Sequence, residues 1–306
     1  MLTDAKILVT GATGSVAASI IRFLAPHNEV WGAARFSREG SRDDVEALGA
    51  KPVSVDLASG DLYALPDDFT NVLHLAHFRG APSDVHEAIR NNGEGTGHLL
   101  HHCRKAKAAL VMSSGAVYSA VEDPWDFPSE DSPIGSAFTP WAPTSGPSKV
   151  AQEAVARFCA VAFGLPVVIT RLNTVYADAQ GFLPPINMDT IMRDMPVSVR
   201  WAPMPHHPIH IDDLCLQLEA MLDAASTPAN IVNWGGDEVV TTQEWCTMVG
   251  EWSGKEVTLK TEPVTGATHT AGSDQTRRKA ITGPSTIDFR QAFRAIFDAR
   301  YGGAAD

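Results

Sequence analysis

The stretch TGATGSVA at residues 10–17 is the feature of this sequence that most restricts its fold. It follows AKILVT, an apolar run of strand length, and opens a helical pattern, VAASIIRFLA. Gly11 permits a tight turn, Gly14 lets a bound group approach the backbone, and the small Ala17 allows the helix to pack closely on the strand. A strand, a glycine turn and a helix in this order are typical of a βαβ unit that binds a dinucleotide.

The diphosphate of such a dinucleotide is expected at the N-terminus of this helix. Backbone N–H groups without helical partners and the helix dipole both favour an anion there. The predicted contacts are the residues of the turn itself: Gly11, Thr13, Gly14, Ser15 and Val16.

Apolar runs of strand length alternate with helical stretches along the first two thirds of the chain. Such alternation predicts a parallel sheet covered on both faces, that is, an α/β fold with a doubly wound parallel sheet. The predicted strands are AKILVT, EVWGAA, PVSVDL, NVLHLAH, ALVMSS and LPVVITRLN. We further predict a long helix over about 83–107, a helix opened by Lys149, and a functional loop over 120–144.

The alternation of strands and helices becomes less regular after about residue 178, where prolines separate short predicted elements. We therefore expect two parts. Residues 1–177, with a strand and a helix from 211–234, should form the nucleotide-binding domain. Residues 178–210 and 235–306 should form a smaller C-terminal substrate-binding lobe.

Composition excludes several classes of partner. A formal net charge of -12 argues against a nucleic-acid-binding surface, and no apolar run has the length of a membrane helix. The chain starts directly in a strand and a glycine turn, so we expect a cytoplasmic protein without a signal peptide. Four scattered cysteines predict reduced core thiols. A small-molecule substrate is the expected partner, and a homodimer is left open.

The end of the second predicted strand indicates which nicotinamide is bound. GAARFSREG places Arg35 at the tip of the strand and Arg38 shortly after it, where NAD-binding proteins carry an acid. An arginine at this place accommodates a 2′-phosphate, so NADP(H) is expected in preference to NAD. Asp56 and the adjacent Leu57 follow the third strand and are expected beside the adenine.

Several motifs together carry a family resemblance. TGATGSVA, VDL, NVLHLAH, NNGEGTGHLL, VMSSGAVYS, SGPSK, RLNTVYA and HPIHIDDL occur in this order. Over about residues 5–220 the chain resembles the extended short-chain dehydrogenase/reductases, the NAD(P)-dependent epimerase/dehydratase family. The resemblance implies a Rossmann domain with a small substrate lobe, and it covers epimerases, dehydratases, reductases and cofactor sensors alike.

The resemblance also implies roles for individual residues. Ser114 would hold the substrate oxygen, Lys149 would hold the nicotinamide ribose, and Asn92 would have a structural or water-anchoring role. The other residues expected near the cofactor by this resemblance are Leu75, Ala76, His77, Asn173 and Val175.

Position 145 departs from the family pattern. The resemblance implies a tyrosine four residues before Lys149, and this chain has Ser145 there. A serine hydroxyl is shorter and far less acidic than a phenol. Loss of the usual general acid should reduce the rate of the reaction by a factor of about 10² to 10⁴.

Two groups are candidates for the missing proton donor. His77 ends the fourth strand, and its ordinary pKa suits acid–base chemistry near neutrality. The alternative is a water in the space left by the ring, held by Ser145, Ser114 and Lys149. Tyr118 and Tyr176 are interpreted as packing residues. No metal site is predicted.

Two sets of residues give indications of the substrate. Sugar-nucleotide members of the family carry a basic residue before the HIDDL-like motif, where this chain has His206 and His207, with Arg200 further back. Aromatic and methionine side chains indicate a small, apolar hydroxy or carbonyl compound, although core packing explains about half of them equally well. They are Trp125, Phe127, Phe138, Trp141, Phe182, Met188, Met192, Met195, Trp201 and Met204.

The sequence therefore predicts an NAD(P)-dependent enzyme of the short-chain dehydrogenase/reductase type with a non-standard proton donor. A catalytically silent NADP(H)-binding sensor or scaffold is one alternative. A sugar-nucleotide epimerase or dehydratase, or a lyase or isomerase that uses the nicotinamide transiently, is the other.

Overall fold

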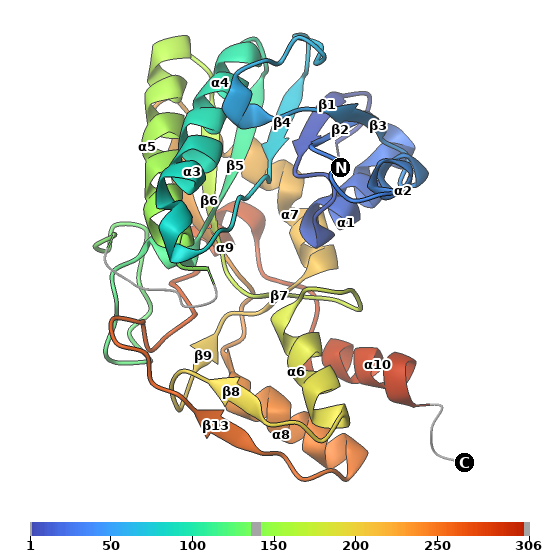
Figure 1. The fold of residues 1–306 in the computed structure, drawn as a ribbon, viewed down its shortest axis with the longest axis vertical. Coiled ribbons are helices and arrows are strands. Elements are labelled where there is room, and N and C mark those ends of the chain that lie inside the picture. The colour runs from blue at the N-terminus through green and yellow to red at the C-terminus, as the bar shows by residue number, and fades with distance from the viewer. Residues whose placement is uncertain (1, 136–141, 303–306) are drawn as a thin grey trace. The chain divides into compact units, whose positions relative to one another are not determined.

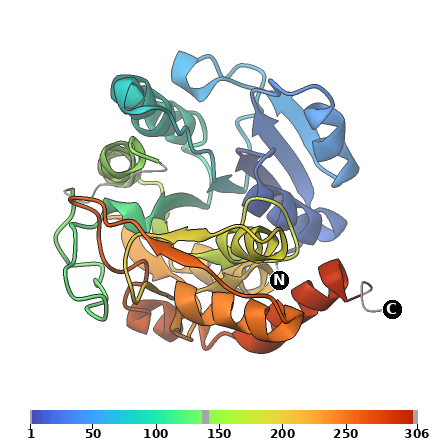
Figure 2. The ribbon, with the colours of Figure 1, turned by 60° about the horizontal axis from the view of Figure 1, so that its bottom comes forward.

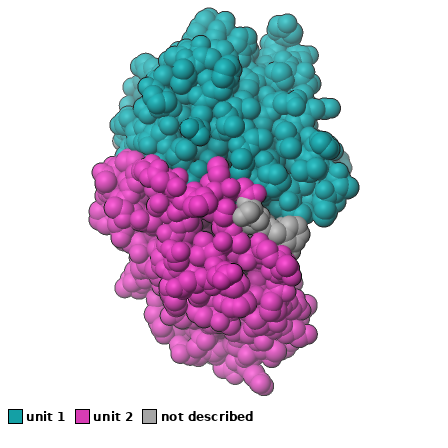
Figure 3. All heavy atoms as spheres, turned by 90° about the vertical axis from the view of Figure 1, so that its left-hand side faces the viewer, with its two compact units in different colours: residues 1–117, 141–171, 215–232 teal, residues 118–140, 172–214, 233–306 magenta. Residues whose placement is uncertain are grey.

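The computed structural model describes residues 2–135 and 142–302. The chain divides into two compact units, which Figure 3 colours separately. Unit 1 is formed by residues 1–117, 141–171 and 215–232, and unit 2 by residues 118–140, 172–214 and 233–306. Unit 2 thus includes 118–140, a segment that the predicted boundaries assign to the nucleotide-binding domain.

Among the described residues, the main sheet has seven strands in the order β11-β6-β5-β4-β1-β2-β3 (Figure 1). Neighbouring strands from β5 through β4, β1 and β2 to β3 pair in parallel. The strand order changes direction at β1, so the predicted doubly wound α/β fold is confirmed. The strands are β1 (Lys6–Thr10), β2 (Glu29–Ala34), β3 (Lys51–Ser54), β4 (Asn71–His74), β5 (Ala108–Ser114), β6 (Val167–Leu172) and β11 (Asn230–Trp234).

Helices lie on both faces of this sheet (Figure 1), and α3, α4 and α5 are seen nearly end-on in Figure 2. In α1, buried Ala17, Ile20, Ile21 and Leu24 recur at the spacing of one helical face. The helices are α1 (Ser15–Leu24), α2 (Ser41–Ala47), α3 (Val85–Ile89), α4 (Gly95–His102), α5 (Ser145–Phe163) and α7 (Ile211–Asp223). Short helical turns connect them: η1 (Ala25–His27), η2 (Leu57–Ser59), η3 (Pro82–Asp84), η4 (Arg90–Glu94) and η5 (Gly115–Val117).

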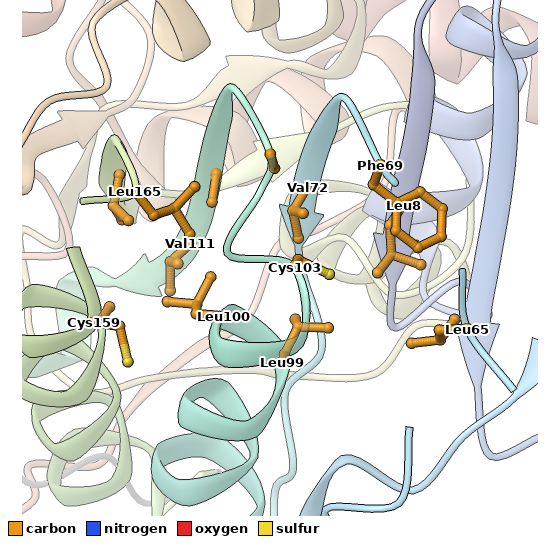
Figure 4. Close-up of a cluster of buried hydrophobic side chains, with 14 of the residues drawn as sticks. Leu8, Leu65, Phe69, Val72, Leu99, Leu100, Cys103, Val111, Cys159 and Leu165 are labelled. Atoms are coloured by element: carbon orange, nitrogen blue, oxygen red, sulfur yellow. The ribbon is translucent and has the colours of Figure 1, made fainter. Parts of the chain in front are cut away.

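The core between the sheet and α4 and α5 is apolar (Figure 4). Leu8, Val72 and Val111 of three adjacent strands belong to one buried cluster with Leu99 and Leu100 of α4. The four cysteines are buried and free, and Cys103 and Cys159 belong to this cluster. The prediction of core thiols is confirmed.

The long helix predicted over about 83–107 is interrupted and ends earlier. A π-helical turn, η4, separates α3 from α4, and α4 ends at His102. Glycines allow close packing here, because a Cβ at Gly93 would lie 3.3 Å from the Cβ of Ala151 on α5, and one at Gly95 would lie 3.1 Å from the Cβ of Leu57. The hydrophobic pattern of the sequence continues from α3 into α4. It therefore does not predict the extra residue of the π turn.

Two further boundaries differ from the prediction. Strand β4 ends at His74, three residues before the end of the predicted NVLHLAH strand, because the Ala76 N–H donates to the side chain of Thr10 and not to a main-chain carbonyl of β1. Helix α5 begins at Ser145, so Lys149 lies in its second turn instead of opening it. Pro147 is tolerated in the first turn, where backbone N–H groups have no helical acceptor.

Unit 2 has its own core. Tyr176, Met188, Trp245, Phe289 and Phe293 are buried together in it. Its helices are α6 (Leu183–Met192), α8 (Thr242–Ser253), α9 (Thr276–Thr282) and α10 (Phe289–Tyr301). Its short strands pair as β7 (Val175–Tyr176) with β10 (Ile209–His210), β9 (Pro205–His206) with β12 (Val240–Thr241), and β8 (Val197–Val199) with β13 (Leu259–Thr261). Within the described ranges, no helix is both long and apolar enough to cross a membrane.

The turn after β1 leaves no space for a side chain at position 11. Gly11 has φ +68°, and a Cβ there would lie 2.8 Å from Ala76 Cα and 2.9 Å from Ala76 N. Gly40 provides a comparison, because it has φ +74° but no atom within 4 Å of its hypothetical Cβ.

We therefore expect Gly11→Ala to be more destabilising than Gly40→Ala. The Gly40 change should cost about 1–2 kcal/mol for the left-handed backbone alone. The Gly11 change should cost about 1–3 kcal/mol more, because two backbone segments must separate. Urea unfolding of both variants measures this difference. Equal losses would contradict the close approach of the turn to Ala76.

Candidate functional site

Most of the predicted site residues in unit 1 follow the carboxyl ends of parallel strands. Gly14 caps α1 after β1, and a Cβ there would meet only Gly11 O, at 3.2 Å. The first turn of α1 carries no acidic residue. This turn is therefore open, uncharged and at the positive end of a helix, which fits the diphosphate of a dinucleotide. Thr13, Ser15 and Val16 lie on the same turn.

The two arginines after β2 differ in their surroundings. Arg35 is exposed, and its guanidinium carbon lies 5.9 Å from the centre of the Phe78 ring. Arg38 is also exposed, but it forms an ion pair with Asp44. Asp56 accepts a hydrogen bond from Ala58 N at 3.0 Å and so caps the η2 turn that begins at Leu57. Arg35 is thus the better placed of the two for a 2′-phosphate.

A buried chain of hydrogen bonds starts at the end of β1. Thr10 Oγ1 lies 2.7 Å from His74 Nδ1, and His74 Nε2 lies 2.7 Å from Thr96 Oγ1. The Thr96 hydroxyl donates its only hydrogen to Asn92 O at 2.6 Å, so it must accept from His74. His74 therefore carries its proton on Nε2 and accepts from Thr10 at Nδ1. Burial and the Lys149 charge lower the pKa of His74 to about 3, which keeps the ring neutral.

The chain continues to Lys149. Gln152 Nε2 donates to Thr96 Oγ1 at 3.1 Å, which turns the Gln152 Oε1 atom toward α5. Lys149 Nζ donates to this oxygen at 2.8 Å and to Met112 O at 2.7 Å. Both acceptors are uncharged. The lysine side chain is held in place without a carboxylate partner.

Burial dominates the electrostatics of Lys149, whose residue is only 2% exposed. Loss of solvation and the nearby Arg79 charge lower the pKa of Lys149 to about 7, while Glu153 opposes the shift. Glu153 raises the Lys149 pKa only in part, because its carboxylate is bound by other side chains. It accepts from Ser113 at 2.6 Å and forms a buried ion pair with Arg171, with Nη2 2.8 Å from Oε2.

Ser145 and His77 are brought together at the start of α5. Ser145 Oγ lies 3.0 Å from His77 Nε2, and Arg79 Nε donates to His77 Nδ1 at 3.3 Å. A guanidinium can only donate, so this contact leaves the His77 proton on Nε2, facing Ser145. The Ser145 oxygen then accepts from His77, and its own hydrogen is left to donate to another group.

The charge state of His77 limits its use as an acid. Burial, the Lys149 charge and the Arg79 charge lower the pKa of His77 to about 2. At pH 7 the His77 ring is neutral, and a neutral imidazole is too weak an acid to donate its remaining N–H proton. The imidazole also reaches the Ser145 hydroxyl, close to where the sequence predicts a water-filled space.

Ser114 and Asn92 have different surroundings. Ser114 is half-buried at the end of β5, and its Oγ accepts from Ala116 N at 3.2 Å. The described residues provide no acceptor for the Ser114 hydroxyl hydrogen. Asn92 is buried, binds both backbone groups of Phe78, and donates to Ser148 Oγ at 2.9 Å. These bonds place Asn92 as a brace between η4, α5 and the segment that carries Leu75, Ala76 and His77.

The remaining predicted cofactor contacts belong to unit 2. Asn173 donates its backbone N–H to Trp234 O at 2.8 Å, and its Oδ1 accepts from Ser273 Oγ at 3.0 Å. Val175 is buried in β7 opposite Ile209. These contacts hold the segment within unit 2.

The two tyrosines that the sequence indicates as packing residues also lie in unit 2, and both are buried. Tyr118 is buried and donates to Asn233 Oδ1 at 2.5 Å. Tyr176 packs on Phe289 and His210, and burial raises its pKa further above its ordinary value. Neither phenol is a ready acid at neutral pH.

His206 has no charge to offer a phosphate. It is buried between Thr174 Oγ1 at 2.7 Å and Thr242 Oγ1 at 3.0 Å, against the ring of Trp245. Burial, followed by Arg200 and His207, lowers the pKa of His206 to about 3. His207 is likewise neutral near pH 7, because burial lowers its pKa to about 4.

Core packing accounts for part of the apolar set that indicated an apolar substrate. Phe182, Met188 and Met204 are buried in unit 2. Trp201 stacks on His269, with ring centres 3.5 Å apart, and Trp125 is exposed beside Phe127. Phe138 and Trp141 lie outside the described residues. No group of three metal-ligating side chains occurs in the part of the chain that the structure describes.

Three residues of this site were not singled out from the sequence. Gln152 follows Lys149 by three positions, so helical periodicity alone would place it beside the lysine. Arg79 follows His77 by two residues. Thr96 gave no signal, because its role depends on the side chains that meet around it.

Comparison with known proteins identifies the family. Residues 7–194 match the NAD dependent epimerase/dehydratase family. The chain belongs to this family. The search of curated proteins found no match.

Solved structures of this family share the fold. The UDP-glucuronic acid 4-epimerase from Bacillus cereus, solved with UDP-glucuronic acid and NAD, is 23% identical, with a TM-score of 0.80 over 95% of this chain and 98% of that one. The UDP-N-acetylglucosamine 4-epimerase from Methanobrevibacter ruminantium, solved with UDP-N-acetylmuramic acid, is 17% identical, with a TM-score of 0.80 over 98% and 100%. The Bordetella bronchiseptica enzyme WbmG, solved with NAD and UDP, is 21% identical, with a TM-score of 0.79 over 98% and 96%.

The buried lysine should make stability depend on pH. Its folded pKa of about 7 lies below the ordinary lysine value of about 10.4, so the unfolded chain binds more protons between these values. The cost of burying the charge is present in full below about pH 7 and is relieved as pH rises toward 10. Relative to Lys149→Met, the wild type should therefore gain up to about 1.4 kcal/mol per pH unit in this window.

Denaturant unfolding of both proteins from pH 6 to pH 10 measures this gain. Lys51→Met, at a lysine whose side chain is exposed, serves as the control for removing a surface lysine. A constant difference for Lys149→Met would show that the buried lysine does not titrate in this range.

Proposed function

We propose that this chain is an NAD(P)-dependent enzyme of the epimerase/dehydratase type, in which Ser145 and His77 occupy the place of the usual tyrosine. The observation that carries the proposal is that Lys149 is bound to Met112 of β5, the strand that Ser114 ends, and lies in α5, the helix that Ser145 begins. A protein that only bound the cofactor would need no second hydroxyl group at this point. When bound, the nicotinamide would supply hydride transfer.

The residues divide the work as follows. Ser114 donates its free hydroxyl hydrogen to the substrate oxygen. Ser145, which already accepts from His77, adds a second O–H donor. The pKa of Lys149 is about 7, so this side chain can take up or release a proton near neutral pH. Two hydroxyl donors stabilise a developing oxyanion but deliver a proton less readily than a phenol.

A sugar nucleotide is the substrate class best supported by the comparisons. The solved relatives hold UDP or a UDP-sugar in their crystals. This favours the sugar-nucleotide alternative over the small apolar compound that the sequence first indicated. His206 cannot hold a diphosphate by charge, so another cation would have to do so. Arg200 is the candidate, because burial lowers its pKa only to about 10 and it stays charged.

A second candidate function is that of a catalytically silent NADP(H)-binding protein. The neutral His77 ring and the absence of a phenol at position 145 favour it. Turnover decides between the two functions.

The cofactor proposed is NADP(H), with NAD as the alternative, and Arg35 carries this choice. Arg35→Ala should weaken NADPH binding about 10- to 100-fold and leave NADH binding nearly unchanged, because a charge-assisted contact to the 2′-phosphate is lost. Arg38→Ala is the matched control and should have a smaller effect, since Arg38 is already paired with Asp44. Fluorescence titration with both nicotinamides measures this. Tighter binding of NADH by the wild type, with no effect of Arg35→Ala, would assign NAD instead.

The function itself is tested by restoring the phenol. Ser145→Tyr alone should gain little activity, because the new ring meets the His77 imidazole that now lies 3.0 Å from Ser145 Oγ. The double variant Ser145→Tyr with His77→Ala should gain about 10²-fold or more in nicotinamide-dependent turnover of UDP-sugars, with His77→Ala alone as control. Ser114→Ala should reduce turnover in every background. If neither the wild type nor the double variant acts on UDP-sugars or simple carbonyl compounds, the silent binding function takes over.

A further inference from the structure

Gln152 provides the side-chain acceptor of the Lys149 ammonium. Gln152 is buried in α5, one turn after the lysine. Its Oε1 accepts from Lys149 Nζ at 2.8 Å, and its Nε2 donates to Thr96 Oγ1 at 3.1 Å. The amide cannot be reversed, because its NH₂ group would then face the ammonium while its oxygen faced Thr96, whose only hydrogen goes to Asn92 O.

The orientation of Gln152 is therefore set at Thr96, whose hydrogen goes to Asn92 O. Thr96 is left as an acceptor, so His74 donates to it and in turn accepts from Thr10 of β1. The hydroxyl hydrogens of Thr10 and Thr96 and the ring hydrogen of His74 each have one acceptor, and Asn92 O can only accept. These directions leave Thr96 as an acceptor for the Gln152 NH₂ group, so the oxygen of Gln152 is presented to Lys149.

We propose that Gln152 is a positioning residue that holds the Lys149 ammonium on an uncharged acceptor, in an orientation fixed by Thr96. The inference rests on the proposed function for its consequence, since Lys149 is the group placed at the nicotinamide. A carboxylate at position 152 would bind the ammonium more tightly and fix its proton. An apolar side chain would leave the ammonium with a single protein acceptor.

Other charges around Lys149 do not replace this control. His74 on β4 and His77 after it are neutral. Arg79 repels the ammonium from the same segment. Glu153 on α5 attracts it, but its carboxylate is bound by Arg171 of β6. On the side of β5 the lysine donates to the uncharged carbonyl of Met112.

The experiment titrates Lys149 directly in the protein without cofactor. Lysine labelled with ¹³C at Cε is incorporated, and Lys149→Arg identifies the Lys149 signal by its loss. In the wild type the signal should shift with a midpoint near neutrality. Gln152→Glu should raise this midpoint by about one pH unit or more, and Gln152→Met should lower it. Gln291→Glu on the exposed face of α10 adds the same charge elsewhere and should leave the midpoint unchanged.

Opposite shifts in the Glu and Met variants are the decisive result, because a side chain that only packed α5 would move both midpoints in the same direction. If either variant does not fold, the other still decides by the direction of its shift. An unchanged midpoint in the folded variant would overturn the proposal.

A second measurement separates this inference from the proposed function. The dissociation constant of NADPH is measured against pH in the wild type and in Gln152→Glu. A pH dependence that moves with the lysine midpoint supports both proposals. A lysine midpoint that moves while NADPH binding does not would support the role of Gln152 and overturn the placement of Lys149 at the nicotinamide.

Discussion

The burial of an ammonium group that no described carboxylate binds directly is the constraint on which the carboxyl edge of the sheet in unit 1 depends. Lys149 is held by a main-chain carbonyl and by one amide oxygen. The amide is oriented by Thr96, and Thr96 is oriented by the requirement that its hydrogen reach Asn92 O. A buried polar network of this kind tolerates no unsatisfied member, since each lost partner costs about 1–3 kcal/mol. The network therefore links β1, β4, α4 and α5 through hydrogen bonds as well as through the apolar core.

Burial also determines the state of His77. It is the largest cause of the lowered His77 pKa, and the charges of Lys149 and Arg79 lower it further. The neutral ring then acts as a hydrogen-bond partner of Ser145 and not as a store of protons. Position 145 thus presents a hydroxyl group whose side-chain partner among the described residues is a neutral imidazole.

Unit 2 shows how burial can cancel the expected role of a residue. His206 stands where the sequence suggests a basic group for a diphosphate, yet two threonine hydroxyls and a tryptophan ring enclose it. Enclosure removes its charge. The methionine and phenylalanine side chains that suggested an apolar ligand are similarly used, in part, to build the core of this unit.

The sequence by itself determined the fold class, because strand-length apolar runs, helical periodicity and the glycine turn at Gly11 are local signals that agree with one another. It also located Ser114, Ser145, His77 and Lys149, since motif spacing places them at the ends of strands and at the start of α5. Only the tertiary structure decided what these groups can do. The contact of Ser145 with His77 joins residues 68 positions apart, and the charge state of Lys149 depends on burial and on the charges of Arg79 and Glu153. Protonation is set by the surroundings of a group in three dimensions, and a one-dimensional pattern carries no measure of them.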